Sequence, residues 1–362
     1  MATRARFHPL PVRSVDPLTD DSVAITFDVP DELADAYAHA AGQHVAIVAP
    51  HLADGVRRSY SICTAAGSGE LTVGVKVLPG GAFSAYARDT LQPGDVLEVL
   101  SPVGRFGPRD LDPDGPARTV VGIAAGSGIT PVLSIAATVL EQEPQSRVTL
   151  LYGNRTSRSV MFTEEIEDLK DRFPDRFQLL HLLSREPGGV ELLSGRLDGA
   201  RLKQLLDSLV PPDDVDAWYL CGPHAMVVEL RDTLLARDVE PTRVHTELFH
   251  ADATPPAPVP PTAPVDTPAD GAEVTVVLDG RRSTVRLPAD GVPVLDAALQ
   301  VRADAPFSCR GGVCGTCRAK VLEGTVRMDH TYALEPDEID RGYVLACQSH
   351  PTSDRVVLDF DV

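Results

Sequence analysis

The sequence predicts a multidomain protein that combines an antiparallel β-barrel, a doubly wound α/β domain and a small α+β domain. Residues 1–115 contain short β-rich runs separated by proline and glycine turn signals, which is typical of a barrel. Residues 116–249 alternate apolar strands with helical segments, as a parallel sheet requires. A proline-rich segment at 250–272 then leads to residues 273–362, where a hairpin and a helix precede four cysteines.

Length and charge limit the class of protein. A chain of 362 residues has room for two or three domains with ordinary cores. The formal charge is -19 and none of the four segments is basic, so nucleic acid and anionic lipid are poor partners. Met1 to Arg6 carry positive charge but no apolar run follows them, so no signal peptide is predicted. We expect a cytoplasmic protein whose six cysteines stay reduced.

A charge-free run from Val120 to Leu140 is long enough for a membrane helix, but its composition favours another interpretation. It contains Gly122, Gly126, Gly128 and Pro131, and it changes midway from β-branched to helix-forming residues. The run therefore predicts a strand, a glycine-rich turn and a helix.

The barrel segment carries two short motifs that suit a dinucleotide. Its predicted strands are Val23–Val29, His44–Val48, Arg57–Thr64, Leu71–Val77 and Val96–Leu100. On the third of these, Arg58 and Tyr60 share a face and present a guanidinium beside an aromatic ring, although an exposed arginine next to a half-buried tyrosine is equally consistent. Gly81 and Ser84 precede or begin a predicted helix, as a pyrophosphate site would require; a plain hairpin turn at Pro79 is the alternative.

These motifs together resemble the flavin-binding signature of the ferredoxin-NADP reductase family. The resemblance rests on Arg58-x-Tyr60-Ser61, Gly81-x-x-Ser84 and Pro102-x-Gly104-x-Phe106. It implies a bound FAD, with Arg58 and Ser84 on the pyrophosphate, Tyr60 against the isoalloxazine and Ser61 near its reactive N5. Where the family has Pro-Gly-Gln, this chain has Ala41-Gly42-Gln43, which affects only a turn.

The second segment begins as a nucleotide-binding unit. The apolar strand Thr119–Ala124 runs into a turn with Gly126, Gly128, Thr130 and Pro131, and a helix follows to Glu141. Further strands are predicted at Val148–Tyr152, Phe177–Leu183 and Ala217–Cys221, and further helices at Glu164–Asp171, Gly199–Leu209 and Met226–Ala236. The order predicts a doubly wound parallel sheet.

Basic residues after the second and third strands indicate the nucleotide. An NAD site usually places a carboxylate after the second strand, whereas a 2′-phosphate needs arginine. Here Arg155 and Arg158 follow the second strand, although they could also be solvated loop charges. Ser184-Arg185, after the third strand, resembles the NADP-specific pair of the reductase family. NADPH is therefore predicted over NADH.

The same resemblance assigns two more elements. Cys221-Gly222-Pro223 is similar to the family's Cys-Gly-Pro beside the nicotinamide C4, although a strand-end cysteine can also be a small buried apolar residue. Glu247-Leu248-Phe249 is similar to its closing acidic-x-aromatic element. The likeness implies Phe249 near the flavin, Glu247 in proton handling and Cys221 at the hydride-transfer site.

The linker and last segment have separate signatures. Ala251 to Ala272 hold seven prolines and no lysine or arginine, which predicts an extended tether or a passive spacer. Strands at Val274–Leu278 and Ser283–Leu287, joined by an Asp-Gly turn, then precede a helix at Val294–Gln300.

Four cysteines follow with the spacing C-x4-C-x2-C and a distant fourth. Cys309, Cys314, Cys317 and Cys347 thus match the plant-type 2Fe-2S ligand pattern. Gly311, Gly312 and Gly315 leave the loop free to adopt positive φ and turn N–H groups toward the sulfurs. Structural zinc usually shows two C-x2-C pairs, and disulfides are not expected in a cytoplasmic protein. The whole segment resembles the β-grasp of plant-type ferredoxins.

Three cofactor sites on one chain predict electron transfer. A nicotinamide gives two electrons and an iron-sulfur cluster accepts one, so a flavin between them is the converter. The histidines form no His-x-x-His or Glu-x-x-His set, so oxygen activation is assigned to a partner. The domain order resembles reductase components of multicomponent oxygenases. The stretches 58–63, 152–157, 311–317 and 334–338 resemble in particular the reductase subunits of phenylacetyl-CoA epoxidases, and this likeness implies a diiron oxygenase partner that acts in phenylacetate breakdown. Another oxygenase, such as a steroid or aromatic-ring hydroxylase, or a non-catalytic redox-sensing module are the alternatives.

Overall fold

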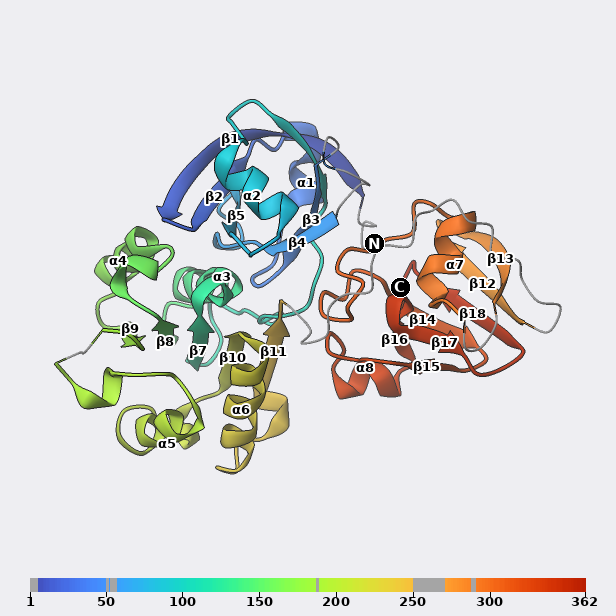
Figure 1. The fold of residues 1–362 in the computed structure, drawn as a ribbon. Helices are drawn as coiled ribbons and strands as arrows, with labels where there is room; N and C mark the ends of the chain where they lie inside the picture. Colours follow the sequence, from blue (N-terminus) through green and yellow to red (C-terminus); the bar gives the residue numbers. More distant parts are fainter. Residues whose placement is uncertain (1–5, 50–51, 53–56, 187–188, 250–270, 288–290) are drawn as a thin grey trace. The chain divides into compact units, whose positions relative to one another are not determined.

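The computed structural model describes residues 6–49, 52, 57–186, 189–249, 271–287 and 291–362 and divides into two compact units (Figure 1). The larger unit holds most of residues 6–249, and the smaller holds the residues that follow the linker. Residues 250–270 of the predicted linker lie outside the described residues, and Ala272 already begins a strand. Among the described residues, no helix has the length and apolar character needed to cross a membrane.

Six antiparallel strands form the predicted barrel at the start of the chain. Their order is β4-β3-β6-β1-β2-β5, and an isolated bridge between Ile62 and Val73 joins the two edge strands. The strands are β1 (Phe7–Thr19), β2 (Ser22–Phe27), β3 (His44–Val48), β4 (Arg57–Ser61), β5 (Leu71–Lys76) and β6 (Val96–Leu100), with helices α1 (Ala34–Tyr37) and α2 (Ala82–Asp89). Alternate strand residues fill an apolar interior that includes Leu10, Ile25, Ile47, Val73 and Leu97.

The first strand, β1, was not predicted because prolines at positions 9, 11 and 17 argue against a strand. In the structure each half of β1 pairs on one side only: residues 7–11 pair with β6, and residues 12–19 pair with β2. A proline lacks an N–H donor, so it is tolerated where that side of the strand has no partner. The strand therefore changes its pairing partner midway, from β6 to β2.

The second part of the larger unit is the predicted α/β domain. Five parallel strands lie in the order β11-β10-β7-β8-β9. They are β7 (Thr119–Ala125), β8 (Arg147–Asn154), β9 (Phe177–Leu183), β10 (Ala217–Gly222) and β11 (Val244–Leu248), connected by α3 (Ile129–Gln142), α4 (Thr163–Arg172), α5 (Gly199–Ser208) and α6 (His224–Leu235). The order reverses between β7 and β10, which sets the place where a ligand would bind.

Helix α3 explains the charge-free run in the sequence. It is apolar on nearly all sides because it packs against both the sheet and the barrel, and residues 129–140 are all buried. Ser134 donates a hydrogen bond to the Thr64 carbonyl at 2.7 Å, and Thr138 accepts one from Ala66 N at 2.8 Å. One hydrophobic core, which includes Ala41, Cys63 and the α3 residues, therefore continues from the barrel into the α/β domain.

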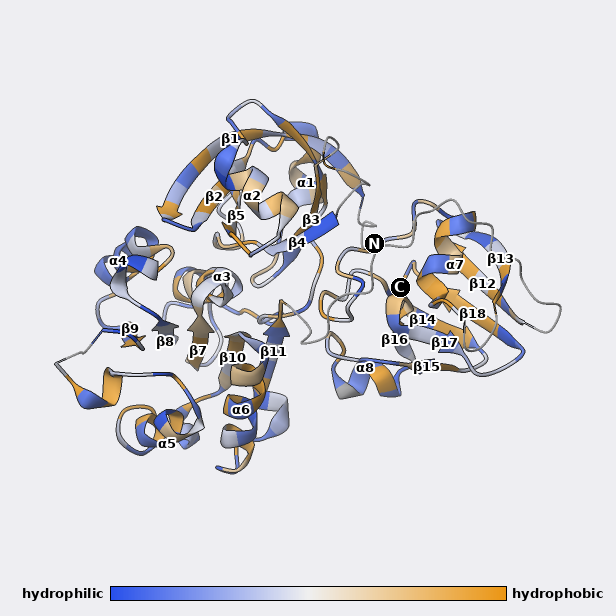
Figure 2. Ribbon diagram, viewed as in Figure 1, coloured by the Kyte–Doolittle hydropathy of each residue, from blue (hydrophilic) through white to orange (hydrophobic). Residues whose placement is uncertain are grey.

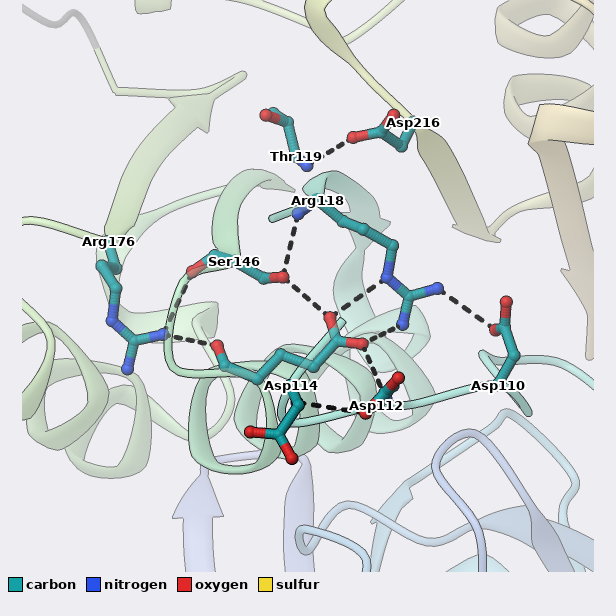
Figure 3. A network of polar contacts seen from close by, with 9 residues as sticks. Asp110, Asp112, Asp114, Arg118, Thr119, Ser146, Arg176 and Asp216 are labelled. Atoms are coloured by element: carbon teal, nitrogen blue, oxygen red, sulfur yellow. Dashed lines mark hydrogen bonds and ion pairs between the residues drawn. The ribbon is translucent and has the colours of Figure 1, made fainter. Parts of the chain in front are cut away.

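A polar network holds the amino-terminal edge of the parallel sheet (Figure 3). The buried carboxylate of Glu143 accepts hydrogen bonds from Arg118 Nε at 3.1 Å and from the Ser146 hydroxyl at 2.8 Å. Arg176 donates to the carbonyls of Glu143 and Ser146. Arg118 also pairs with Asp110 at 3.1 Å. These groups tie together the segments that enter β7, β8 and β9. The predicted nucleotide-binding residues lie at the opposite, carboxyl edge of the sheet.

The smaller unit is an α+β domain with its own core. Five strands lie in the order β13-β12-β18-β14-β16, and β15 pairs with β17. The elements are β12 (Ala272–Leu278), β13 (Arg281–Leu287), α7 (Val294–Val301), β14 (Arg318–Glu323), β15 (Val326–Met328), α8 (Pro336–Asp340), β16 (Tyr343–Leu345), β17 (Ser349–Pro351) and β18 (Arg355–Asp359). Figure 2 shows β12 as mainly hydrophobic and the exposed helix α4 of the other unit as mainly hydrophilic. The first hairpin and α7 were predicted, whereas the five strands after the cysteine loop were not.

Candidate functional site

The predicted nucleotide-binding residues gather at the carboxyl edge of the parallel sheet. Gly126–Gly128 follows β7, Arg155 follows β8 and Ser184 follows β9. Cys221 lies near the end of β10, which is the direct neighbour of β7. In open α/β sheets the crevice at such a reversal of strand order is where ligands bind. The position fits the nicotinamide nucleotide predicted from the sequence.

Two glycines of the turn have different physical roles. A Cβ on Gly128 would lie 2.2 Å from the Cys221 carbonyl oxygen, so no other residue allows this contact. Gly126 adopts φ +54°, and a Cβ there would meet nothing within 4 Å. Gly126 thus leaves an open stretch of backbone that fits a phosphate. Thr130 is buried and its hydroxyl donates to the Ser127 carbonyl at 3.1 Å, which holds the start of α3.

The three predicted catalytic residues lie together in the larger unit. The Ser61 hydroxyl, at the end of β4, donates a hydrogen bond to Glu247 Oε2 at 3.0 Å. Glu247 on β11 is the register partner of Cys221 on β10. Burial, and then the nearby Glu247 carboxylate, raise the pKa of the Cys221 thiol well above its usual value. The thiol is therefore neutral at physiological pH, and the serine and carboxylate form a short path on which a proton can move.

Two of the predicted flavin-contacting side chains, Arg58 and Tyr60, lie on β4. Arg58 is exposed, and its guanidinium donates to the Arg57 carbonyl at 2.8 Å. Tyr60 is half-buried with its ring 5.3 Å from that of Phe83. The tyrosine therefore has one ring face fixed by packing, as a residue that stacks on a cofactor needs. Phe249 packs against the core of the larger unit, and its proximity to a flavin stays a prediction.

Ser84 has a local partner set that the sequence did not indicate. It is buried in α2, its hydroxyl donates to the Gly81 carbonyl at 3.1 Å, and it accepts from Leu78 N at 3.2 Å. A Cβ on Gly81 would lie 2.5 Å from this hydroxyl. Ser84 and Gly81 therefore fix the turn that begins α2, and the contact of Ser84 with a pyrophosphate stays a prediction.

The basic residues predicted to bind the 2′-phosphate of the nucleotide lie on two adjoining loops. Arg185 N donates to the Arg155 carbonyl at 2.8 Å, so the loops after β8 and β9 are joined by their backbones. Ser184, Arg155 and Arg185 are all exposed. The adjacent Glu186 was not singled out from the sequence, and its carboxylate accepts hydrogen bonds from the backbone N–H and the hydroxyl of Ser157.

The four cysteines of the smaller unit form two pairs. The thiols of Cys309 and Cys314 are within hydrogen-bond reach of each other, and so are those of Cys317 and Cys347. Cys314, followed by burial, raises the pKa of Cys309, so a thiolate there needs a compensating cation. Over the described residues, no three or more His, Cys, Asp and Glu side chains converge on one metal position. A two-iron cluster needs two thiolates on each iron, and two pairs fit that demand.

The loop around the cysteines supplies N–H donors to the sulfurs. Gly311 N lies 3.4 Å from Cys309 Sγ, and the Gln348 amide lies 3.4 Å from Cys347 Sγ. Gly312 and Gly315 adopt positive φ as predicted, but Gly311 does not. Arg310 takes the left-handed conformation in its place, with φ 55°, and its guanidinium pairs with Asp296. Such a conformation is uncommon for a residue other than glycine.

A buried ion pair beside the cysteine loop was also missed. Arg318 directly follows Cys317, and its Nη1 lies 2.6 Å from Glu338 Oε1. The guanidinium also covers the Tyr343 ring at 4.1 Å from the centroid. Glu338 and Glu335 also form a capping box at the start of α8. The Glu-x-x-Glu spacing in the sequence could have revealed this capping box.

Family models match three stretches of the chain. Residues 9–107 match an oxidoreductase FAD-binding domain, and residues 123–232 match an oxidoreductase NAD-binding domain. Residues 276–352 match a 2Fe-2S iron-sulfur cluster binding domain. The predicted cofactor classes FAD, nicotinamide nucleotide and 2Fe-2S are confirmed.

Curated relatives match over nearly the full length of the chain. A component of the 1,2-phenylacetyl-CoA epoxidase from Escherichia coli is 45% identical over 98% of each chain. The ferredoxin reductase component of 3-ketosteroid-9-alpha-monooxygenase from Mycobacterium tuberculosis is 36% identical and covers 95% of this chain and 93% of its own. The chain belongs to the family of oxygenase reductase components. This reductase is therefore an oxidoreductase, and the alternative of a non-catalytic redox sensor is excluded.

Solved structures confirm the three-part fold. Phthalate dioxygenase reductase is 22% identical with a TM-score of 0.59 and covers 98% of both chains. An intact type IV self-sufficient cytochrome P450 monooxygenase is 23% identical with a TM-score of 0.68. That match covers 97% of this chain but only 41% of the longer P450 chain. At these identities the match establishes the architecture alone.

Proposed function

We propose that this reductase takes electrons from NADPH and delivers them singly to the diiron oxygenase component of a phenylacetyl-CoA epoxidase, in the breakdown of phenylacetate. The relative from Escherichia coli, 45% identical over 98% of the chain, supports this partner. Arg155 and Arg185, exposed on adjoining loops, support NADPH because a 2′-phosphate needs basic groups. We place the reductase in the cytoplasm, where the thiolates that a 2Fe-2S cluster needs stay reduced.

The positions of several side chains support the roles that we propose for them. When bound, the nicotinamide supplies a hydride, the flavin accepts the electron pair and the 2Fe-2S cluster carries one electron at a time. Arg58 and the turn fixed by Ser84 would bind the FAD pyrophosphate, and Tyr60 would stack on the flavin ring. Cys309, Cys314, Cys317 and Cys347 would hold the irons.

Ser61, Cys221 and Glu247 would act at the flavin-nicotinamide junction. The Ser61 hydroxyl is oriented by its hydrogen bond to Glu247, so it can pass a proton to that carboxylate. Cys221 is neutral because burial raises its pKa, so it would pack against the nicotinamide without adding charge. The Ser61–Glu247 hydrogen bond is the single observation that carries this assignment.

The decisive experiment is turnover of purified oxygenase components with the reductase and either NADPH or NADH. Arg185→Ala should reduce the preference for NADPH because the 2′-phosphate loses a charged donor. Arg147→Ala is the matched control, since Arg147 is exposed at the opposite end of β8. Equal selectivity in both variants, or failure to support epoxidation with the cognate oxygenase, would contradict the proposal.

The cluster's role has its own test. Cys314→Ser should keep NADPH-dependent flavin reduction, measured at the flavin absorbance band, but abolish delivery of electrons to the oxygenase. A steroid oxygenase is the second candidate partner, because the mycobacterial relative is 36% identical over 95% of the chain. Turnover with that oxygenase exceeding turnover with the epoxidase would replace the first partner with the second.

A further inference from the structure

The side-chain amide of Gln348 lies between the first and the fourth cysteine of the predicted cluster site. Its Nε2 lies 2.9 Å from the Arg310 carbonyl oxygen, 3.0 Å from the Cys347 carbonyl oxygen and 3.4 Å from Cys347 Sγ. Arg310 directly follows Cys309, and Gln348 directly follows Cys347. One amide therefore connects the loop of the first cysteine with the sulfur of the fourth.

The neighbours of this amide fix which of its two polar ends faces the sulfur. Two of the three nearby atoms are carbonyl oxygens, which accept hydrogen bonds and repel another oxygen. The NH2 end of Gln348 must therefore face them, and the same end lies beside Cys347 Sγ. A neutral thiol is a weak acceptor, whereas a thiolate bound to iron carries negative charge and attracts an N–H group more strongly.

The amide and the sulfur are both shielded from solvent. Gln348 is 7% exposed and Cys347 is 5% exposed, so little water competes for the amide hydrogens. A Cβ on Gly312 would lie 3.0 Å from Gln348 Cγ, and Gly312 adopts φ +75°. Gly312 thus leaves the space in which the side chain of Gln348 lies. In such a buried position, an N–H group acts more strongly on a nearby charge than it would in water.

We propose that Gln348 raises the reduction potential of the 2Fe-2S cluster by donating an N–H group to the sulfur of Cys347. The inference rests on the proposed assignment of the four cysteines as cluster ligands. Reduction by one electron from the flavin adds one negative charge to the cluster and its thiolates. A donor at a sulfur therefore stabilises the reduced state more than the oxidised state. Gln348 is a positioning residue that acts through Cys347 and makes the cluster a better electron acceptor.

Replacing Gln348 by methionine removes the N–H groups and keeps a side chain of similar length. The equilibrium constant for cluster reduction should fall about tenfold, because a hydrogen bond to a charged acceptor contributes roughly that factor. This change lowers the midpoint potential by roughly 59 mV for one electron. The measurement is a redox titration of the full chain, followed by the electron paramagnetic resonance signal of the reduced cluster.

Gln300→Met is the matched control, because Gln300 is exposed near the end of α7 in the same domain. Its midpoint potential should equal that of the wild-type chain. Equal potentials in Gln348→Met and Gln300→Met would overturn the inference. Faster loss of iron to a chelator in Gln348→Met, with an unchanged potential, would also overturn it, because Gln348 would then only stabilise the loop.

A second measurement tests the contact in the unsubstituted protein. With an isotopic nitrogen label in the glutamine side chains, pulsed electron paramagnetic resonance of the reduced cluster should detect a coupling to the labelled nitrogen. The coupling should disappear in Gln348→Met and persist in Gln300→Met. Absence of the coupling from the wild-type chain would contradict the proposed hydrogen bond, whether or not the methionine variant retains its cluster.

The ligand assignment is tested separately. If Cys314→Ser retains the wild-type resonance of the cluster, the assignment of the four cysteines falls, and the inference about Gln348 falls with it. If Cys314→Ser loses or alters that resonance while Gln348→Met keeps the wild-type potential, the ligand assignment stands and only the role of Gln348 falls.

Discussion

Replacing Glu338 by glutamine should destabilise the iron-sulfur site, although Glu338 is not one of the predicted cluster ligands. Glu338 is 5% exposed and its partner Arg318 is 17% exposed, so the pair is largely shielded from solvent. Arg318 follows Cys317 and is the register partner of Leu345, two residues before Cys347. The pair therefore stabilises the pairing of β14 with β16, the two strands next to Cys317 and Cys347.

The size of the effect follows from burial. Breaking a buried ion pair by removing one charge costs about 3–5 kcal/mol, because the remaining charge is uncompensated. Arg318 keeps its contact with the Tyr343 ring and a neutral hydrogen bond to glutamine, so about 3 kcal/mol is expected. That corresponds to a roughly hundredfold increase in opening of the domain. Opening exposes the cluster, so cluster loss should accelerate by a similar factor.

The assay is decay of the cluster absorbance in the presence of an iron chelator, with the flavin absorbance of the same chain as internal reference. Asp337→Asn is the matched control on the same helix. Asp337 pairs with Arg341 at 2.7 Å, but their side chains are 71% and 52% exposed, so that pair contributes only about 0.5 kcal/mol. Equal rates of cluster loss in Glu338→Gln and Asp337→Asn would refute the reasoning.

Two further predictions concern the larger unit. Burial opposes ionisation of Glu143, but hydrogen bonds from Arg118 and Ser146 outweigh it and lower the pKa of Glu143. The pair is therefore fully stabilising above pH 4.5, the carboxyl's usual value, and is lost as the pH falls through the lower folded value. Glu143→Gln should cost about 3 kcal/mol at neutral pH and flatten this acid dependence in calorimetric melting; parallel pH profiles would contradict it. Gly128→Ala should slow NADPH-dependent flavin reduction at least tenfold, because the new Cβ would lie 2.2 Å from the Cys221 carbonyl oxygen; stopped-flow reduction at the wild-type rate would show that the turn can shift.

Local sequence patterns led to the most specific site predictions where spacing and backbone geometry act together. The turn with Gly126 and Gly128 was recognisable because a tight strand-to-helix turn excludes side chains. The cysteines were recognisable because four ligands need a fixed spacing. Both patterns are confined to a few consecutive residues, so no knowledge of the tertiary structure was needed.

Contacts between distant segments could not be predicted. The bond between Ser157 and Glu186 depends on how the loops after β8 and β9 are joined, and the Arg318–Glu338 pair depends on the position of α8 beside β14. Strand β1 was missed for a different reason: its prolines are compatible with a strand only because it changes partners midway. The left-handed Arg310 was unexpected because the two glycines that directly follow it adopt such a conformation more readily.

The core that continues from the barrel into the α/β domain limits how such enzymes can be recombined. Helix α3 is buried against both parts, and the Ser61–Glu247 hydrogen bond joins residues 186 positions apart. A chimera that exchanges only the first hundred residues would leave mismatched surfaces on α3. The segment after residue 270 has a separate core, so it is the portion that can be exchanged between homologous enzymes without leaving mismatched packing on α3.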